Sequence, residues 1–301
     1  MTFSTLESMK KCVYSCLMTL TIEHLTEYHY PEQAFDSFNE LHLQPADDYR
    51  QTLISFHLEV NPDTPMRSHL DYYGNTAHHF HLAHTHKLLS VHTLATVSTY
   101  MIPLPQPTHA SVLPEMRHRF FEYLAPTVRV PLNQDWLEPL EVRPLLPDEE
   151  IVSHLDYLTK HLRQIFTYEP NSTHVDTPLA EFVGLRMGVC QDYAHAMLAI
   201  CRQEGIPARY VSGYVHSNPT GDETMIGAEG SHAWIEVFLP GSGWVGYDPT
   251  NGCLINEAHV KVAVGRDYDD VPPLRGLRRG GGQDSLKVSV KVRRAGEAVL
   301  K

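Results

Sequence analysis

Three side chains in the second half of the chain have the types and the order expected of a thiol enzyme. The first is Cys190, which follows Gly188-Val189, a turn that leads directly into a predicted helix. A cysteine at the N-terminus of a helix has its thiolate stabilised by backbone N–H groups and by the helix dipole, which prepares it for nucleophilic attack. A small buried hydrophobic residue is the alternative interpretation, so the assignment depends on partner residues.

Two partners follow in the sequence, His232 and Asp248, on predicted strands joined by the turn-rich loop 239–243. If Phe238 pairs with Trp244 in an antiparallel hairpin, the histidine and the aspartate project from one face as diagonal neighbours within hydrogen-bond reach. The aspartate would then orient the imidazole, whose other ring nitrogen would accept the thiol proton. The sequence thus predicts a Cys–His–Asp arrangement.

The elements that must position these residues are predicted to be α+β. An acidic first turn at residues 148–150 begins a helix whose apolar positions recur at helical spacing as far as Ile165. A second helix is predicted over residues 190–203, followed by strands at 209–215, 232–238 and 244–248. We therefore expect a helix that starts at Cys190 and packs on an antiparallel sheet.

The first half of the chain has a different pattern. Between residues 20 and 100, short alternating runs are separated by turn residues, which indicates an all-β domain and favours a sandwich. A Pro-rich connection follows, with a predicted helix over residues 113–124. Near the C-terminus, an alternating run with outward lysines at residues 286–292 predicts an exposed edge strand.

The length of 301 residues favours two domains, at about 150 residues each. The predicted division is an extension outside the fold or before the true start of the protein (1–17), an N-terminal β domain (18–105), a connecting segment with a helix (106–147) and a catalytic domain (148–301). The apolar run that begins at Cys12 has no small-residue cleavage site, so it is not interpreted as a signal peptide.

The composition excludes several classes of function. With 24 Lys and Arg against 36 Asp and Glu, the net charge of −12 repels phosphate backbones and anionic lipids, so neither nucleic acid nor membrane is expected as a partner. No apolar stretch approaches the roughly 20 residues of a membrane span. Five cysteines, a sparse and odd number, form no disulfide framework and suit a reducing compartment, so a cytoplasmic location is expected.

Four motifs of the second half occur in the order found in one known family. They are Gly188-Val189-Cys190-Gln191-Asp192-Tyr193-Ala194-His195, Gly205-Ile206-Pro207-Ala208-Arg209-Tyr210-Val211-Ser212-Gly213-Tyr214, His232-Ala233-Trp234 and Asp248-Pro249-Thr250-Asn251-Gly252. With these motifs the chain resembles the bacterial transglutaminase-like family, often described as candidate cysteine proteases. The early runs Tyr28-His29-Tyr30, Asn39-Glu40-Leu41-His42-Leu43-Gln44-Pro45 and Asp71-Tyr72-Tyr73-Gly74-Asn75 resemble that family's N-terminal β domain.

The resemblance implies a papain-like core with Cys190 as nucleophile, His232 as general base and then acid, and Asp248 orienting the histidine, without a metal or other cofactor. It implies a thioester intermediate formed on a peptide, protein or other amide substrate. We expect water as the acceptor, because animal transglutaminases have Trp after the nucleophile where this chain has Gln191. A transglutaminase with amine acceptors, and a non-catalytic binding or assembly module, stay open as alternatives, as does a homo-oligomer.

The resemblance leaves one donor to the oxyanion unassigned, beside the backbone N–H of Cys190. The candidates for it are Gln191, Tyr168 and Arg186. Four further side chains lie where they could shape or wall the cleft, although a structural or supporting role is the favoured interpretation for them: Asp192, His195, Trp234 and Trp244.

Other potential ligand clusters are interpreted as structural. Histidines are dense between residues 78 and 92, and His79 and His81 would share a strand face, but no cysteine or carboxylate completes a shell for zinc or nickel. A solvated strand face is favoured. Asp267, Asp269 and Asp270 indicate an exposed turn rather than a calcium site.

Two cysteines and one loop near the motifs complete the expectations. Cys201 lies 11 residues after Cys190 on the same predicted helix, a separation of about 16 Å that is too long for a disulfide, so it is expected in the core. Cys253 follows the Asp248 motif closely, where either a place near the site or a turn without function fits it. The loop 216–230, rich in Gly and polar residues, is a candidate lid.

Overall fold

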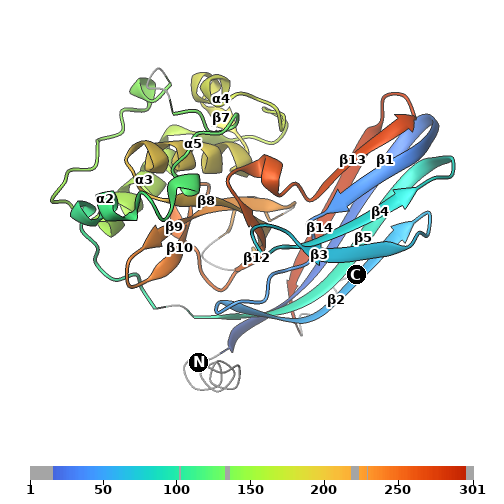
Figure 1. Ribbon diagram of the computed structural model, residues 1–301, viewed down its shortest axis with the longest axis horizontal. Coiled ribbons are helices and arrows are strands. Elements are labelled where there is room, and N and C mark those ends of the chain that lie inside the picture. The colour runs from blue at the N-terminus through green and yellow to red at the C-terminus, as the bar shows by residue number, and fades with distance from the viewer. Residues whose placement is uncertain (1–15, 102, 133–135, 218–223, 229, 296–301) are drawn as a thin grey trace.

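The computed structural model describes residues 16–101, 103–132, 136–217, 224–228 and 230–295. The chain forms two lobes side by side, one built from a large curled sheet and the other from helices packed on a smaller sheet (Figure 1). The predicted extension lies outside the described residues as far as residue 15, and the first strand already begins at Cys16. The longest described helix has 15 residues, and none of the helices in this part of the chain has the length and hydropathy that a membrane crossing requires.

The first lobe is a seven-stranded antiparallel sheet. Its strands are β1 (Cys16–Leu41), β2 (Gln51–Asn61), β3 (Met66–Leu70), β4 (Thr76–Leu82), β5 (His86–Tyr100), β13 (Leu274–Gly280) and β14 (Ser285–Arg294). The long β1 is central, because its first part pairs with β5 and β14 and its last part with β4 and β13. The curl encloses a core that includes Leu41, Phe80 and Leu89. The predicted all-β domain is confirmed, as one curled sheet instead of two packed sheets.

The C-terminal segment corrects one predicted domain boundary. Residues 274–294 were expected in the catalytic domain, but they return to the first lobe as β13 and β14. The edge-strand prediction for residues 286–292 is confirmed, since β14 pairs only with β1 among the described strands. The outward Lys287 and Lys291 lie 3.5 Å from carboxylates of Glu27 and Glu23 on the neighbouring strand.

In the sequence, an irregular segment connects β5 of the first lobe to α3 (Ile151–Ile165) of the second. It contains η1 (Ala110–Val112), α2 (Leu113–Met116), η2 (Phe121–Tyr123) and η3 (Glu138–Leu140). The predicted helix over residues 113–124 is wrong beyond Met116. The backbone of Phe120 leaves the helical region, with φ −118° and ψ 26°. Its buried ring packs on Phe238 of the second lobe with ring centroids 4.2 Å apart. Burial of this aromatic ring therefore prevails over local helix propensity.

The second lobe is a helical layer on a five-stranded antiparallel sheet with the order β11-β10-β9-β8-β12. Its elements are α3 (Ile151–Ile165), β6 (Thr167–Tyr168), α4 (Leu179–Leu185), β7 (Met187–Gly188), α5 (Cys190–Gln203), β8 (Ala208–Val215), β9 (His232–Leu239), β10 (Gly243–Asp248), β11 (Cys253–Leu254), β12 (His259–Gly265) and η4 (Tyr268–Asp270). Every residue of α5 from Cys190 to Arg202 is buried. Phe238 pairs with Trp244, so the predicted hairpin register is confirmed.

Side-chain amides of the first lobe pair with the outer strand of the second sheet. Gln51 donates to the carbonyl of Lys261 and accepts its N–H, both at 2.8 Å. Asn75 makes the same two contacts with Val264, also at 2.8 Å. Because β12 is an edge strand, these amides satisfy backbone groups that an edge leaves unpaired. The motif that ends at Asn75 thus holds the lobes together.

Candidate active site

Cys190 begins α5 at the end of a tightly packed turn. The Asp192 carboxylate accepts the N–H of Val189 at 2.8 Å and the hydroxyl of Thr173 at 2.6 Å, which fixes the first turn of the helix. A Cβ on Gly188 would lie 2.5 Å from the Phe182 ring and 2.6 Å from this carboxylate. Only glycine fits there, and the turn places Cys190 at the helix N-terminus with 8% of the residue exposed.

His232 and Asp248 come from neighbouring strands, at the start of β9 and the end of β10. The imidazole Nε2 lies 2.8 Å from the Asp248 Oδ2, and both side chains are buried. The other ring nitrogen, Nδ1, is buried and has no hydrogen-bond partner among the described residues, while the Cys190 sulfur lies 3.9 Å from the carbonyl oxygen of Ser231, the residue before the histidine. The structure therefore joins His232 to Asp248 and places Cys190 beside the residue that precedes the histidine.

The surroundings of His232 favour its protonated, positively charged form. Burial alone would lower the pKa of His232, but Asp248 and Cys190 outweigh burial and raise the pKa to about 10. Burial would raise the pKa of Asp248, yet His232 and His259 hold it well below its usual range. An imidazolium beside the sulfur is the state that favours a thiolate.

Asp248 is saturated with hydrogen bonds. Its Oδ1 accepts the N–H groups of Thr250 and Asn251 at 2.9 and 3.1 Å. Its Oδ2 accepts the Asn251 Nδ2 at 2.7 Å and lies 3.2 Å from the Nε2 of His259, in addition to its contact with His232. A carboxylate held this way keeps its charge and its orientation.

Sequence reasoning did not find His259, the first residue of β12. Its Nε2 lies 3.2 Å from the Asp248 Oδ2, its Nδ1 lies 3.0 Å from the Asn256 Oδ1 and 3.2 Å from the Asn256 backbone nitrogen, and burial lowers its pKa. Ligand atoms of His232, Asp248 and His259 lie within 4.8 Å of one another, which a metal ion could use. The hydrogen bonds at 2.8 and 3.2 Å satisfy the same atoms without one.

A short described part of the predicted lid, residues 224–228, covers the histidine. Ile226 donates its N–H to the Asn251 Oδ1 at 2.8 Å and accepts the Asn251 Nδ2 at 3.2 Å. Gly227 has φ +87°, and a Cβ there would lie 2.6 Å from the His232 Nδ1. Asn251 therefore joins this segment to Asp248. Residues 218–223 and 229 of the loop lie outside the described residues.

The three candidates for the second oxyanion donor have different partners in the structure. Gln191 donates its Nε2 to the carbonyl of Val175 at 3.1 Å. Tyr168 pairs with Gly188 in the β6–β7 ladder, two residues before Cys190. The guanidinium of Arg186 donates to the carbonyl of Pro139 and is turned away from this role.

Three of the four remaining candidates support the site from within the core. Asp192 caps α5, and His195 accepts the N–H of Tyr268 at 3.3 Å with its pKa lowered to about 3 by burial. Trp234 is buried, with its ring centroid 6.1 Å from that of His232. Trp244 lies at the far end of β10 and packs on Tyr123, so the structure does not bring it to Cys190.

The clusters interpreted as structural match the expectation for the histidine stretch but not fully for the acidic turn. His79 and His81 lie on one exposed strand face. In the described part of the chain, the one group of side chains placed closely enough to hold a metal ion is His232, Asp248 and His259, and neither of the strand-face histidines belongs to it. The acidic turn was expected to be exposed, but only Asp269 is: Asp267 is buried and Asp270 half-buried. The Asp267 carboxylate accepts the N–H of Asp269. Cys201 is buried in the core, and the backbone of half-buried Cys253 pairs with Asp248.

Comparisons with known proteins identify the family. Residues 143–249 match the Transglutaminase-like superfamily, and residues 20–98 match the Bacterial transglutaminase-like N-terminal region. An uncharacterized protein of Mycobacterium leprae (strain TN) is 36% identical over 281 residues, which cover 91% of this chain and 98% of that protein. The chain belongs to the transglutaminase-like superfamily. The predicted family is confirmed over both lobes.

Two further relatives show where the likeness is strong and where it is partial. The crystal structure of a candidate cysteine protease from Cytophaga hutchinsonii superposes with a TM-score of 0.76 at 20% identity, covering 95% of this chain and 93% of that one, so the two share a fold. A Pseudomonas aeruginosa protein named protein-glutamine gamma-glutamyltransferase is 38% identical over 87 residues, which cover 28% of this chain but 13% of that protein.

Proposed function

We propose that this transglutaminase-like protein catalyses thiol-dependent acyl transfer on amide bonds, with water as the acceptor. The observation that carries the proposal is the buried His232, whose Nε2 is held by Asp248 at 2.8 Å and which follows Ser231, whose carbonyl lies 3.9 Å from the Cys190 sulfur. Nucleophile, base and orienting group are adjacent in the order that this chemistry needs.

In the first half of the reaction, the Cys190 sulfur attacks the carbonyl carbon and forms the S–C bond. The negative charge that develops on the carbonyl oxygen is stabilised by N–H groups at the start of α5. His232 donates the proton that came from the thiol to the leaving amine as the C–N bond breaks. A thioester and a free amine result.

In the second half, His232 takes a proton from water while the water oxygen attacks the thioester carbonyl. The S–C bond then breaks, the carboxylic acid leaves and the Cys190 sulfur is restored with the proton. Asp248 stays ionised throughout, because its two oxygens are fully hydrogen bonded and its pKa is held low.

Trapping of the intermediate tests this proposal. We expect an activated acyl ester to give an acyl adduct on Cys190, found by peptide mass spectrometry, that decays in water and is absent in Cys190→Ser. Half-buried Cys253 serves as the internal control. Adducts that form equally on Cys253, or that persist on Cys190 without hydrolysis, would contradict the proposal.

A primary amine is the second candidate acceptor, favoured by the local likeness to a protein named glutamyltransferase. Incubation of a glutamine peptide with a tenfold range of primary amine separates the two acceptors. Release of glutamate at an amine-independent rate supports hydrolysis. Amine incorporation that outruns hydrolysis in buffered water would make the protein a transglutaminase.

A further inference from the structure

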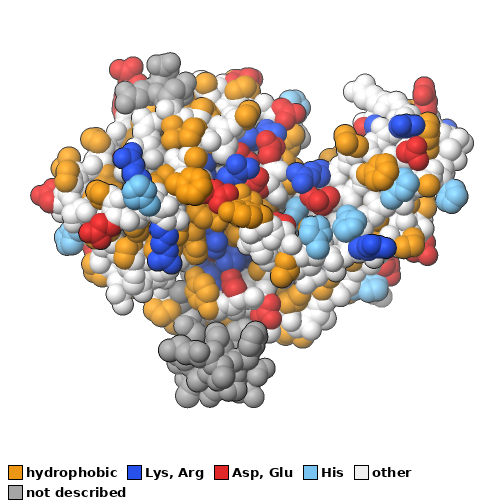
Figure 2. All heavy atoms as spheres, in the orientation of Figure 1, with side chains coloured by type: hydrophobic (Ala, Val, Ile, Leu, Met, Phe, Trp, Pro, Cys, Tyr) orange, Lys and Arg blue, Asp and Glu red, His pale blue; other side chains and the backbone are white. Residues whose placement is uncertain are grey.

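A groove crosses one face of the N-terminal sheet. Its volume is about 860 Å³, within the range of roughly 300–1,000 Å³ typical of binding sites. Its walls come from four adjacent strands, β13, β1, β4 and β3. Figure 2 shows hydrophobic, basic and histidine side chains gathered on the right-hand lobe beside the notch between the lobes.

The strand register places one apolar row across this face. Phe38 pairs with Leu277 on one side and with His81 on the other, and directly paired residues share a face. Phe38 is 58% exposed and Leu277 is 80% exposed. The His81 ring stacks on Phe38, with centroids 4.1 Å apart and an interplanar angle of 7°. Large apolar side chains are therefore held in a fixed, solvent-exposed row.

A second, polar row runs beside it. Glu40 pairs with Arg275 and with His79, and His79 pairs in turn with Arg67. The Arg275 guanidinium binds the Glu40 carboxylate at 2.6 Å, which neutralises both. Arg67 is exposed, and none of the described carboxylates forms an ion pair with it. On a chain with a net charge of −12, the groove presents an uncompensated cation.

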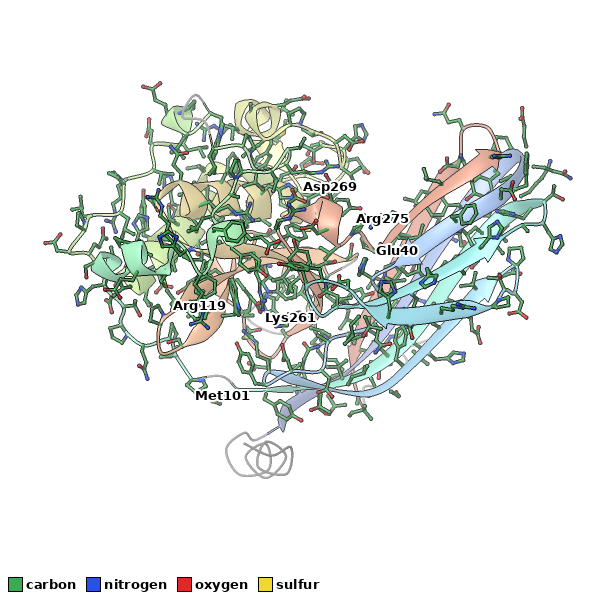
Figure 3. The ribbon with its side chains drawn as sticks, in the orientation of Figure 1. Glu40, Met101, Arg119, Lys261, Asp269 and Arg275 are labelled. Atoms are coloured by element: carbon green, nitrogen blue, oxygen red, sulfur yellow. The ribbon has the colours of Figure 1, made fainter. Side chains whose placement is uncertain are left out.

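One end of the groove contacts the second lobe through Arg275. In Figure 3, Glu40 and Arg275 lie on the side of the sheet that faces Asp269. The Arg275 guanidinium donates to the Asp269 carbonyl at 3.1 Å. The Asp269 carboxylate accepts from Arg129 at 2.8 Å, and Arg129 also donates to the carbonyl of Val175. That carbonyl accepts the side chain of Gln191, the residue after the nucleophile.

We propose that this groove binds an extended acidic segment of the polypeptide substrate, with an apolar side chain on the Phe38–Leu277 row and a carboxylate on Arg67. The exposed apolar row supplies hydrophobic contact, and the cation selects the acidic segment, which the acidic remainder of the surface repels. Naming the occupant as substrate rests on the proposed function, whereas the binding itself requires no catalysis.

Peptide binding to the full chain with Cys190→Ser tests the proposal. The probe is a fluorescein-labelled peptide that alternates Asp with Phe and Leu, and the matched control peptide has Lys at each Asp position. Fluorescence anisotropy is expected to show saturable binding of the acidic peptide alone, weakened by salt. No binding up to about 1 mM, or equal binding of the basic peptide, would overturn the proposal.

Matched variants locate the binding on the sheet. Arg67→Glu and Leu277→Ser, both at exposed positions, are expected to weaken binding of the acidic peptide at least tenfold. Arg293→Glu and Leu286→Ser make the same changes at exposed positions of β14 and are expected to leave it within twofold. Equal losses in both sets would overturn the assignment to the groove. Acyl-adduct formation on wild-type Cys190 is measured separately, so a failure of the proposed chemistry is distinguished from a failure of docking.

Discussion

At the scale of single residues, the candidate site depends on how Asp248 is held. Two imidazoles, one side-chain amide and two backbone N–H groups converge on its carboxylate. His232 and His259 approach the same oxygen from different strands. The orientation of His232 toward the sulfur therefore depends on a contact that β12 supplies.

His259→Ala should slow the reaction of Cys190 without removing any of the three reacting residues. Loss of a hydrogen bond to a charged group corresponds to about 1.5–3 kcal/mol, or roughly 10–100-fold in rate. The measurement is the rate of Cys190 acylation as a function of pH. His259→Gln retains a donor and should recover part of the rate. An unchanged rate and pH profile in His259→Ala would show that the contact has no positioning role.

The residues predicted from the sequence and the one that was missed differ in how local their contacts are. Asp248 and His232 were found because a short hairpin fixes their relative positions, and Cys190 because it begins a helix and precedes them in the order of a thiol enzyme. His259 could not be found in this way. It meets Asp248 only because β12 lies in the sheet of β9 and β10, at an edge that residue spacing does not reveal.

At the scale of elements, the segment at Ile226–Gly227 controls the space around the His232 imidazole. Gly227 combines a positive φ with close approach to the Nδ1 of His232. The segment is tied to Asn251 and, through it, to Asp248. The loop backbone and the site are therefore coupled.

Gly227→Ala should lower the acylation rate of Cys190 more than tenfold, because the added Cβ would displace either the loop or the imidazole. Gly230→Ala is the matched control, since a Cβ there meets no atom within 4 Å and its φ is not positive. Acylation rates and thermal unfolding of the two variants are compared. Equal rates would mean that the loop moves aside without effect on the histidine.

Local sequence patterns were sufficient to predict the regular helices and strands, but not the irregular segment that follows Leu113. The periodicity of α3 and α5 and the alternation in β9 and β10 were sufficient to predict them. The helix expected after Leu113 stops at Met116, since Phe120 turns into the core of the other lobe. A contact between distant segments decided that conformation.

At the scale of the whole molecule, a buried ionic cluster lies where the lobes meet. Glu236 accepts two hydrogen bonds from Arg209 and one from Lys261, and Lys261 also binds Asp48 of the first lobe. Burial alone would raise the pKa of Glu236, but the surrounding cations outweigh it and lower the pKa to about 2. Protonation of the Glu236 carboxylate at low pH is therefore expected to weaken the contact between the two lobes.

Because its folded pKa is depressed, Glu236 contributes stability that is present above its unfolded pKa of 4.5 and is lost as the pH falls toward about 2. The shift corresponds to about 3 kcal/mol. Glu236→Gln should lower the unfolding free energy at neutral pH and flatten its fall between pH 4.5 and 2. Exposed Glu115→Gln is the control. Urea unfolding at several pH values measures both, and the same acid slope in Glu236→Gln as in wild type would contradict this role.

The arrangement of the whole chain was the least predictable from sequence. Residues 274–294 leave the second lobe and complete the sheet of the first, a pairing with residues more than two hundred positions away. The docking of Gln51 and Asn75 on β12 also joins distant segments. Sequence patterns predict which strands form, but which strands pair with each other depends on how the whole chain packs.

The central claim is that His232 activates Cys190, and the most direct measurement is the pH dependence of iodoacetamide alkylation, located by mass spectrometry in wild type and in His232→Ala. With the pKa of His232 raised to about 10, the imidazolium persists at neutral pH, and we expect Cys190 to be labelled well below pH 8 and faster than Cys253. In His232→Ala, labelling should shift to higher pH, toward the value near 8.5 of an ordinary thiol. The same pH profile in both proteins, or no preference for Cys190, would contradict the account.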